Sequence, residues 1–208
     1  MQAVESEKLI LYHTDLRGEW PETAARGFAA QLPYARRLAA AADWDTRRAS
    51  LAGVALALQA LARLAGRSVR AGELVFRRGE KPRLSLDFGA ADLDGAGPDF
   101  SIAHSGPWVG CAAVGRGHVG LDVELGTDAQ RTHWVVREAL IKATGEGLRA
   151  LEDTRALAPT ATGVCWRGAW WHLARPQMFT GAAACVVSSR PLHAIESRFS
   201  VLAELFPP

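Results

Sequence analysis

Cysteines and long apolar runs are both scarce in this chain of 208 residues. The three cysteines, an odd number at wide spacing, give no basis for a disulfide framework or a zinc cluster. No apolar run reaches the ~18 residues of a membrane-spanning helix, and the longest, residues 51–62, is interrupted by a glycine and a glutamine. Residues 1–8 carry acids and lack the apolar segment of a secretory signal. We therefore expect a reduced, cytoplasmic protein with no membrane partner.

The chain also lacks a large excess of charge. Lys and Arg total 24 against 22 Asp and Glu, and this net charge of +2 gives no argument for a nucleic-acid partner. A hydrophobic share of 49% excludes a disordered chain. The net charge is +4 over residues 1–81, −4 over 82–126 and +2 over 127–208. The basic first stretch is compatible with a phosphate-rich small molecule, although solvated helix faces are the simpler interpretation.

Lysine is scarce as well. Of the 24 basic residues only Lys8, Lys81 and Lys142 are lysines. Lysine differs from arginine in presenting a compact, mobile ammonium group. This bias singles out Lys81 and Lys142 as candidate functional residues.

Apolar spacing predicts a mixture of helices and strands. The spacing of three and four residues after residue 45 predicts a long helix that a glycine ends. Strands interleaved with helices indicate the α/β or α+β class. We expect helices over 21–42, 45–66 and 133–144, strands over 8–13, 74–76, 83–86, 100–103, 109–114, 119–123, 164–173, 181–187 and 193–199, and a turn over 104–107.

Asp122 and Glu124 form the first candidate site. Alternation along a strand places both carboxylates on one face, roughly 7 Å apart, and turns Leu121, Val123 and Leu125 toward apolar packing. Neighbouring carboxylates repel each other unless a cation lies between them. Mg²⁺ suits this place because it takes one or two carboxylates and completes its shell with water and phosphate. Two exposed acids at a strand end are the alternative interpretation.

Glu138 and Lys142 form the second candidate site. Their spacing of four residues puts them on one face of the predicted helix. Glu138 could complete a metal shell or take a proton, and Lys142 could hold a phosphate or an oxyanion. A surface ion pair is the alternative interpretation.

His104 and Lys81 are weaker candidates. His104 lies in the predicted turn after a strand, where an imidazole can hold a phosphate or simply pack on the surface. Lys81 precedes Pro82, which fixes the backbone, but an ordinary loop would look the same.

The order of these segments is more informative than any one of them. Four blocks follow one another, GEKP at 79–82, FSIAHS at 100–105, VGLDVE at 119–124 and WVVREALIKATGEGL at 134–148. The chain thereby resembles the 4'-phosphopantetheinyl transferases of the larger, surfactin-synthetase-activating type. Their pattern runs G-K-P, F-N-I-S-H-S, V-G-I-D-I-E and W-T-x-K-E-A-x-x-K-x-x-G-x-G-L. The segment DTRR at 45–48 is similar to the arginine-bearing helix start of that family.

The resemblance implies a fold, a reaction and partners. The family transfers phosphopantetheine from coenzyme A to a serine of an acyl or peptidyl carrier protein and releases adenosine 3',5'-bisphosphate, with Mg²⁺ or Mn²⁺ as the metal. The implied fold has two similar halves related by a pseudo-two-fold axis, with coenzyme A and the metal in the cleft between them. We expect residues 1–105 to form the half with basic coenzyme-binding residues and 106–208 the half with metal-binding acids. A cytoplasmic monomer is expected.

The resemblance also assigns roles to single residues. Asp122, Glu124 and Glu138 match the metal-binding acids, and Glu138 is also the candidate base for the serine hydroxyl. Lys142 matches the lysine that stabilises the pyrophosphate and the departing phosphate. Arg48, Lys81 and His104 match positions that hold the phosphates of coenzyme A. Arg137 stands where the family usually has a lysine on the coenzyme side.

The chain departs from the family pattern in two ways. Ser101 and Ala103 replace the usual Asn and Ser, and Val135 stands where the family often has Thr. Only residues 125–133 separate Glu124 from the tryptophan of the last block, where the family has a longer, carrier-facing segment. A non-catalytic coenzyme A binder, or a regulator that docks on a carrier protein, is therefore the alternative function.

Overall fold

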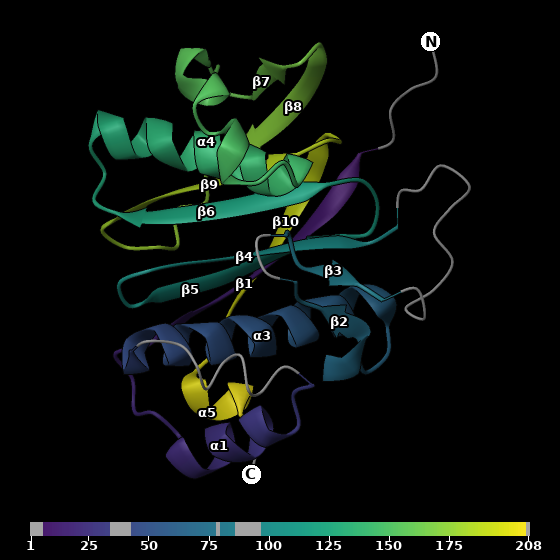
Figure 1. The fold of residues 1–208 in the computed structure, drawn as a ribbon, viewed down its shortest axis with the longest axis vertical. Helices are drawn as coiled ribbons and strands as arrows, with labels where there is room; N and C mark the ends of the chain where they lie inside the picture. The colour runs from purple at the N-terminus through teal and green to yellow at the C-terminus, as the bar shows by residue number, and fades with distance from the viewer. Residues whose placement is uncertain (1–5, 34–42, 78–79, 86–96, 207–208) are drawn as a thin grey trace.

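The structure is a computed structural model that describes residues 6–33, 43–77, 80–85 and 97–206. Its main elements form four layers, which are α4 (Ala129–Thr144), a sheet that this helix covers, another sheet packed on the inner face of that one, and α3 (Trp44–Ala65) on the outside (Figure 1). The largely antiparallel sheets and the helices make the protein a member of the α+β class, and this part of the sequence prediction is confirmed.

The first sheet joins distant parts of the chain. Its order is β10-β1-β5-β4, with β1 antiparallel to β5, β5 antiparallel to β4, and β10 parallel to β1. The expected division into 1–105 and 106–208 stays a prediction, although both sides of it contribute strands to this sheet. The strands are β1 (Glu7–Asp15), β4 (Asp99–Ser105), β5 (Trp108–Val114) and β10 (Leu192–Phe199).

The second sheet is entirely antiparallel, in the order β6-β9-β8-β7. The prediction of a single strand over 164–173 is wrong. Arg167 (φ 49°) and Gly168 (φ 78°) both adopt left-handed backbone angles, which reverse the chain into a two-residue hairpin. The strands are β6 (Val119–Leu125), β7 (Gly163–Trp166), β8 (Ala169–Ala174) and β9 (Ala182–Ser188).

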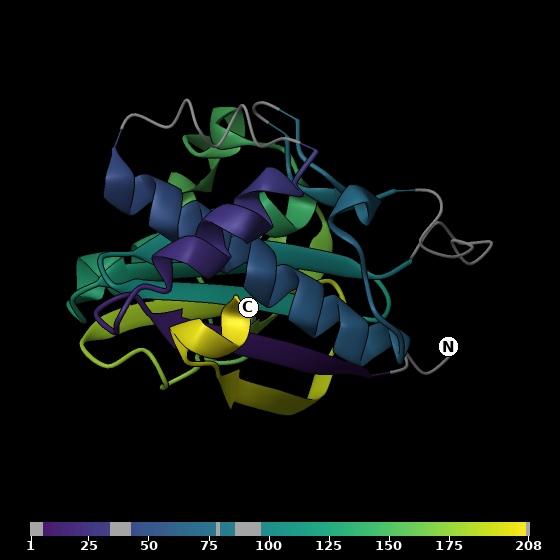
Figure 2. The ribbon, with the colours of Figure 1, turned by 90° about the horizontal axis from the view of Figure 1, so that it is seen from below.

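The two long helices begin and end at residues suited to those places. Asp43 and Asp128 cap them by accepting backbone N–H bonds from Thr46 and Arg131, and Gly66 ends the first helix with a φ of 63°. Figure 2 shows α1 and α5 outside α3. The helices are α1 (Glu22–Ala30), α3 (Trp44–Ala65), α4 (Ala129–Thr144) and α5 (Leu202–Leu205), with 3₁₀ turns η1 (Ala71–Glu73), η3 (Leu148–Ala150) and η4 (Asp153–Ala156); β2 (Leu74–Val75) and β3 (Arg83–Leu84) form a small separate sheet.

Three hydrophobic cores lie between the four layers. Strand alternation sends Ile10 and Tyr12 of β1 toward α3, and Leu9 and Leu11 toward the second sheet. The third core lies between the second sheet and α4. Both faces of each sheet are therefore covered at their centres, which explains why β5 is buried along its whole length.

Helix α3 is long and apolar enough, by length and composition, to cross a membrane. More than half of its apolar window is buried inside the protein, and Leu56, Ala57 and Leu61 are fully inaccessible to solvent. This burial is that of a core helix, because the helix fills the space beneath the first sheet.

The structure moves several predicted boundaries. Strand β4 extends through His104 and Ser105, so the prediction of a turn there is wrong and the reversal begins at Gly106 (φ 54°). Helix α4 begins four residues earlier than expected because Asp128 caps it. The helix expected over 21–42 is shorter, because α1 ends at Ala30 and residues 31–33, which end at Pro33, are not helical; residues 34–42, Gly79 and Leu86 lie outside the described residues.

Candidate functional site

The site is built where α4 crosses β6. Gly120 of β6 lies directly beneath the helix, and a Cβ atom there would stand 1.9 Å from the carbonyl oxygen of Ala139 and 2.5 Å from the amide nitrogen of Ala143. Only glycine permits this approach. It brings the helix close enough for Glu138 and Lys142 to reach the outward face of β6.

A partly buried ion pair joins the two elements. Lys142 Nζ donates to Asp122 Oδ1 at 2.6 Å and lies 3.9 Å from Glu138 Oε2. Asp122 is buried, and its Oδ2 has no hydrogen-bond partner among the described residues. Burial raises the pKa of Asp122 to about 6, because Lys142 only partly offsets the desolvation and two neighbouring glutamates oppose ionisation.

Glu124, the second acid of β6, lies at the outer end of the strand. Ser105 Oγ of β4 donates to Glu124 Oε2 at 3.2 Å, which fixes the carboxylate from the opposite sheet. Asp122 and Glu124 share a strand face, as alternation predicted. Leu121 and Val123 pack in the core, but the prediction is wrong for Leu125, whose side chain is 43% exposed.

The acids are suited to a hard cation, although they are not arranged as a ready-made shell. In the described ranges no group of three or more His, Cys, Asp or Glu is assembled for a metal ion. The unpartnered Oδ2 of Asp122 is nevertheless a free carboxylate oxygen, and its pKa reports the negative charge of Glu138 and Glu124 nearby. Three carboxylates of this kind fit Mg²⁺ or Mn²⁺, with Lys142 now supplying the positive charge among them.

A cavity of about 250 Å³ opens beside this cluster. Lys81 lies on its wall, donating to Asp99 and, at 2.8 Å, to the carbonyl oxygen of Val119. Burial lowers the pKa of Lys81, and Asp99 opposes this effect. The lining residues are Glu80, Lys81, Pro82, Ser101, Ile102, Glu138, Ile141, Lys142, Gly145 and Gly147. Three predicted site residues, from two distant sequence blocks, thus share one cavity.

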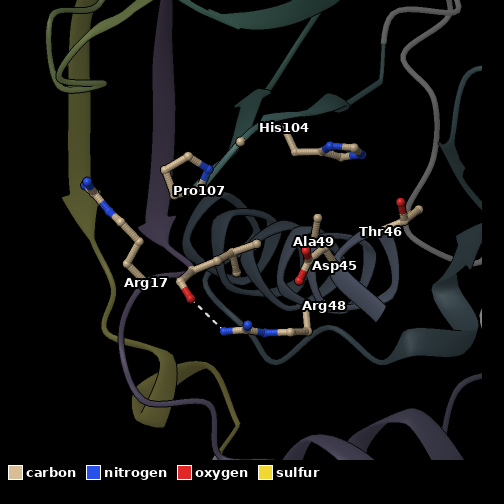
Figure 3. Close-up of a pocket in the computed structure, with 9 residues that line it drawn as sticks. Arg17, Asp45, Thr46, Arg48, Ala49, His104 and Pro107 are labelled. Carbon is tan, nitrogen blue, oxygen red and sulfur yellow. Dashed lines mark hydrogen bonds between the residues drawn. The ribbon is translucent and has the colours of Figure 1, made fainter. Parts of the chain in front are cut away.

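A second cavity, of about 420 Å³, lies between the start of α3 and the β4–β5 turn. Figure 3 shows His104 and Arg48 on different walls of it, with Arg17 at one side. Arg48 Nη2 donates to the carbonyl oxygen of Leu16 at 2.6 Å, and the guanidinium lies 4.8 Å from the ring centre of Trp20. The buried Nε of Arg48 has no acceptor in the described part of the chain. Unused N–H groups beside a cavity suit an anion.

His104 lines the second cavity, and charged residues of the acidic cluster affect its pKa. Part of its ring surface reaches solvent, yet the surrounding protein lowers its pKa by desolvation. The charge of Lys142 also lowers this pKa, while Glu124 raises it. His104 is therefore close enough to the acidic cluster to respond to it.

Arg137 lies apart from the other predicted residues. Its guanidinium donates to the carbonyl oxygen of Leu151 at 2.7 Å and to the hydroxyl of Thr154 at 3.0 Å, and it stacks on Trp134. It lines neither cavity. In this arrangement Arg137 ties α4 to the following 3₁₀ turns.

Sequence reasoning missed three residues of the site. Arg17 lines the second cavity, Asp99 binds Lys81, and Ser105 binds Glu124. The only available signal was the alternation of Asp99 and Ser105 with apolar residues, which places both on one face of a strand.

Comparison of the sequence with known protein families and with curated proteins found no match. The site is therefore interpreted from its own geometry. It combines a buried, incompletely paired carboxylate, two further carboxylates, two cavities and the basic side chains of Lys81, Lys142 and Arg48 that line them.

Proposed function

We propose that this protein transfers 4'-phosphopantetheine from coenzyme A to a serine of an acyl or peptidyl carrier protein. The four ordered sequence blocks motivate the proposal. The observation that carries it is their convergence, since residues 81, 104, 122–124 and 138–142 all lie around the adjacent edges of β4 and β6. A coincidental match of motifs gives no reason for them to meet in space.

The connectivity supports two related halves. In the first sheet and its helix, β1 is followed by α3 and then by β4 and β5, and the strands lie in the order β1-β5-β4. In the second, β6 is followed by α4 and then by β8 and β9, which lie in the order β6-β9-β8. Each helix covers the outer face of its own sheet. This correspondence favours the pseudo-two-fold fold of the family.

The residues present fit the chemistry of such a transfer. The serine oxygen attacks the phosphorus that carries pantetheine, the new ester bond forms, and the bond to the departing adenosine 3',5'-bisphosphate breaks. In this proposal Glu138 accepts the hydroxyl proton and Lys142 neutralises charge on the phosphate oxygens, and the lining of one cavity by both side chains supports these roles. A bound Mg²⁺, held by Asp122, Glu124 and Glu138, would supply further charge neutralisation.

The second cavity supports a place for the remaining phosphate. Arg48 and His104 face a volume large enough for part of a nucleotide, and the buried Nε of Arg48 lacks an acceptor among the described residues. We assign the 3'-phosphate of coenzyme A to this cavity and the pyrophosphate to the side of Lys142.

Intact-mass spectrometry tests the proposal. The protein is mixed with coenzyme A, Mg²⁺ and a panel of apo carrier proteins, beside an Asp122→Asn variant. Asp153→Asn is the matched control, because Asp153 is an exposed aspartate of η4 that pairs with Arg167. A phosphopantetheine mass gain on a carrier, kept in the control and lost in Asp122→Asn, is expected. Equal transfer by Asp122→Asn and the parent would contradict the proposed metal site.

A second function is favoured by the short connection before α4. Only residues 126–128 separate β6 from α4, so the carrier-facing segment expected from the family has no counterpart there. The chain would then bind coenzyme A, or dock on a carrier, without transferring the group. Calorimetry that detects coenzyme A binding, combined with no transfer to any carrier, would favour this function over the first.

A further inference from the structure

The two sheets meet along the edges of β4 and β6. Each strand is the outermost of its own sheet, and no backbone ladder pairs them. An unpaired edge leaves backbone N–H groups that need acceptors. Side chains of β4 supply these acceptors: Asp99 Oδ2 for Val119 N at 2.7 Å, Ser101 Oγ for Leu121 N at 3.0 Å, and Ser105 Oγ for Leu125 N at 3.2 Å.

This row of bonds, which we name the β4–β6 seam, follows strand periodicity on both sides. Donors at 119, 121 and 125 lie on one edge of β6, and acceptors at 99, 101 and 105 lie on one face of β4. The position between them is Ala103, whose methyl group offers no acceptor. The seam thus sets the register of one sheet against the other through side chains alone.

Both ends of the seam also hold a residue of the candidate site. At one end the carboxylate that accepts from Val119 N also accepts from Lys81. At the other end the hydroxyl that accepts from Leu125 N also donates to Glu124 Oε2. Ser101, in the middle, bonds only to backbone in the described structure. Asp99 and Ser105 therefore do two things each. They align β4 with β6, and they hold the side chains of Lys81 and Glu124 in place.

We propose that Asp99 and Ser105 are positioning residues, Asp99 for Lys81 and Ser105 for Glu124. That these two residues serve the transfer of phosphopantetheine rests on the proposed function. An ammonium group has three N–H donors, and Asp99 and the carbonyl of Val119 accept two of them. The third is left for a ligand in the 250 Å³ cavity that Lys81 lines. Ser105 acts in the same way on Glu124, because a hydrogen bond to one carboxylate oxygen orients the other.

Lysine labelling tests Asp99 without any assumption about function. The chain contains only Lys8, Lys81 and Lys142, so limited acetylation followed by peptide mass spectrometry resolves each one. We expect Lys81 to be strongly protected in the parent and to react several-fold faster in Asp99→Asn. Lys8, which pairs with Glu196 on the far side of the first sheet, is the internal reference. Unchanged protection of Lys81 in a folded Asp99→Asn variant would overturn the inference for Asp99.

Metal binding tests Ser105. Electron paramagnetic resonance of Mn²⁺ alone, with no coenzyme or carrier, should show about 10-fold weaker binding to Ser105→Ala, and Ser105→Thr should restore it because the hydroxyl is kept. Ser189→Ala is the matched control, since Ser189 Oγ also accepts a backbone N–H, from His118, and makes no bond to Glu124. Equal Mn²⁺ affinity of Ser105→Ala and the parent would overturn this role.

Kinetics separate the two proposals. If transfer occurs, Asp99→Asn should raise the KM for coenzyme A more than it lowers kcat, since Lys81 would bind the coenzyme rather than take part in bond breaking. A parent protein that neither binds Mn²⁺ nor transfers the group would defeat the proposed function, and the labelling of Lys81 would still decide the role of Asp99. If Asp99→Asn does not fold, the Ser105→Ala and Ser105→Thr pair decides the inference.

Discussion

Two aspartates each form an ion pair with a lysine at the junction of the sheets, and their surroundings differ. Asp99 Oδ2 accepts from both Lys81 and the backbone of Val119, and the same lysine also donates to the carbonyl of Val119. Asp122 accepts from Lys142 through Oδ1, while its buried Oδ2 has no partner in the described ranges. The second pair therefore holds a buried oxygen without a partner, and no atom of the first pair is in that state.

The difference indicates that the Asp99–Lys81 pair holds a binding group in place, while the Asp122–Lys142 pair is the reactive one. Buried polar groups are normally hydrogen-bonded, and an exception needs an explanation such as a missing ligand. The carboxylate with the free oxygen also has the raised pKa and two acidic neighbours, which are features of functional sites. We therefore expect substitution of Asp122 to lower mainly the activity, and substitution of Asp99 to lower mainly the stability.

The largest expected effect is on transfer. Asp122→Asn should lower the transfer rate on the order of 10³-fold, because several kcal/mol of charge stabilisation depend on this carboxylate. The measurement is the initial rate of mass gain on a carrier protein at saturating coenzyme A. The circular dichroism of the variant should match that of the parent. A rate within a few-fold of the parent would show that the unsatisfied pair is not the reactive one.

The next effect is on stability. Asp99→Asn should lower the free energy of unfolding by about 3 kcal/mol, because the buried Lys81 ammonium would lose its counter-charge. Urea unfolding followed by tryptophan fluorescence measures this. Asp153→Asn, on the exposed η4 turn, should change the stability by less than about 0.5 kcal/mol. A loss for Asp99→Asn no larger than this control would remove the distinction between the two pairs.

The third effect is a gain in stability, where the second was a loss. The folded protein binds the proton of Asp122 more tightly than the unfolded chain, since the folded pKa is about 6 against an ordinary value of 3.8. This contribution destabilises the fold above pH 6 and disappears as the pH falls to about 4. Without divalent metal, Asp122→Asn should exceed the parent in stability by roughly 2 kcal/mol at pH 7.5 and equal it near pH 4. Urea titrations with a chelator at both pH values measure the difference; a pH-independent gap would contradict it.

The smallest effect concerns Arg137. Lysine at this position cannot reproduce both bonds to Leu151 and Thr154 or the stacking on Trp134, so Arg137→Lys should cost about 1 kcal/mol of stability. Transfer should stay within about 2-fold of the parent. Thermal unfolding and the mass-gain rate check the two expectations. A large rise in the KM for coenzyme A would instead return Arg137 to the coenzyme site expected from the family resemblance.

Local sequence patterns predicted the parts of the site that depend on short spacings. The same-face placement of Asp122 with Glu124 follows from a period of two, and that of Glu138 with Lys142 from a period near four. Both patterns hold because β6 and α4 are regular over those residues. The predicted turn at His104 and Ser105 failed because backbone pairing with β5 extends the strand past small and polar residues.

Long-range pairing could not be predicted from local patterns. The bond between Asp99 and Lys81 and the row along β6 depend on where two sheet edges meet. The parallel pairing of β10 with β1 joins residues 192–199 to residues 7–13, and no periodicity specifies a partner strand. The hairpin at Arg167 was hidden because apolar residues flank it on both sides.

The return of β10 to the first sheet has a consequence for synthesis on the ribosome. Strand β1 is made first, yet one of its two neighbours is not available until residue 199 has been translated. Helix α5 and Phe206, which complete the core around α3, are made later still. The first sheet therefore has an open edge at β1 while the second sheet, β6 to β9, can already assemble. Strand β10 completes the first sheet only after all strands of the second have been translated.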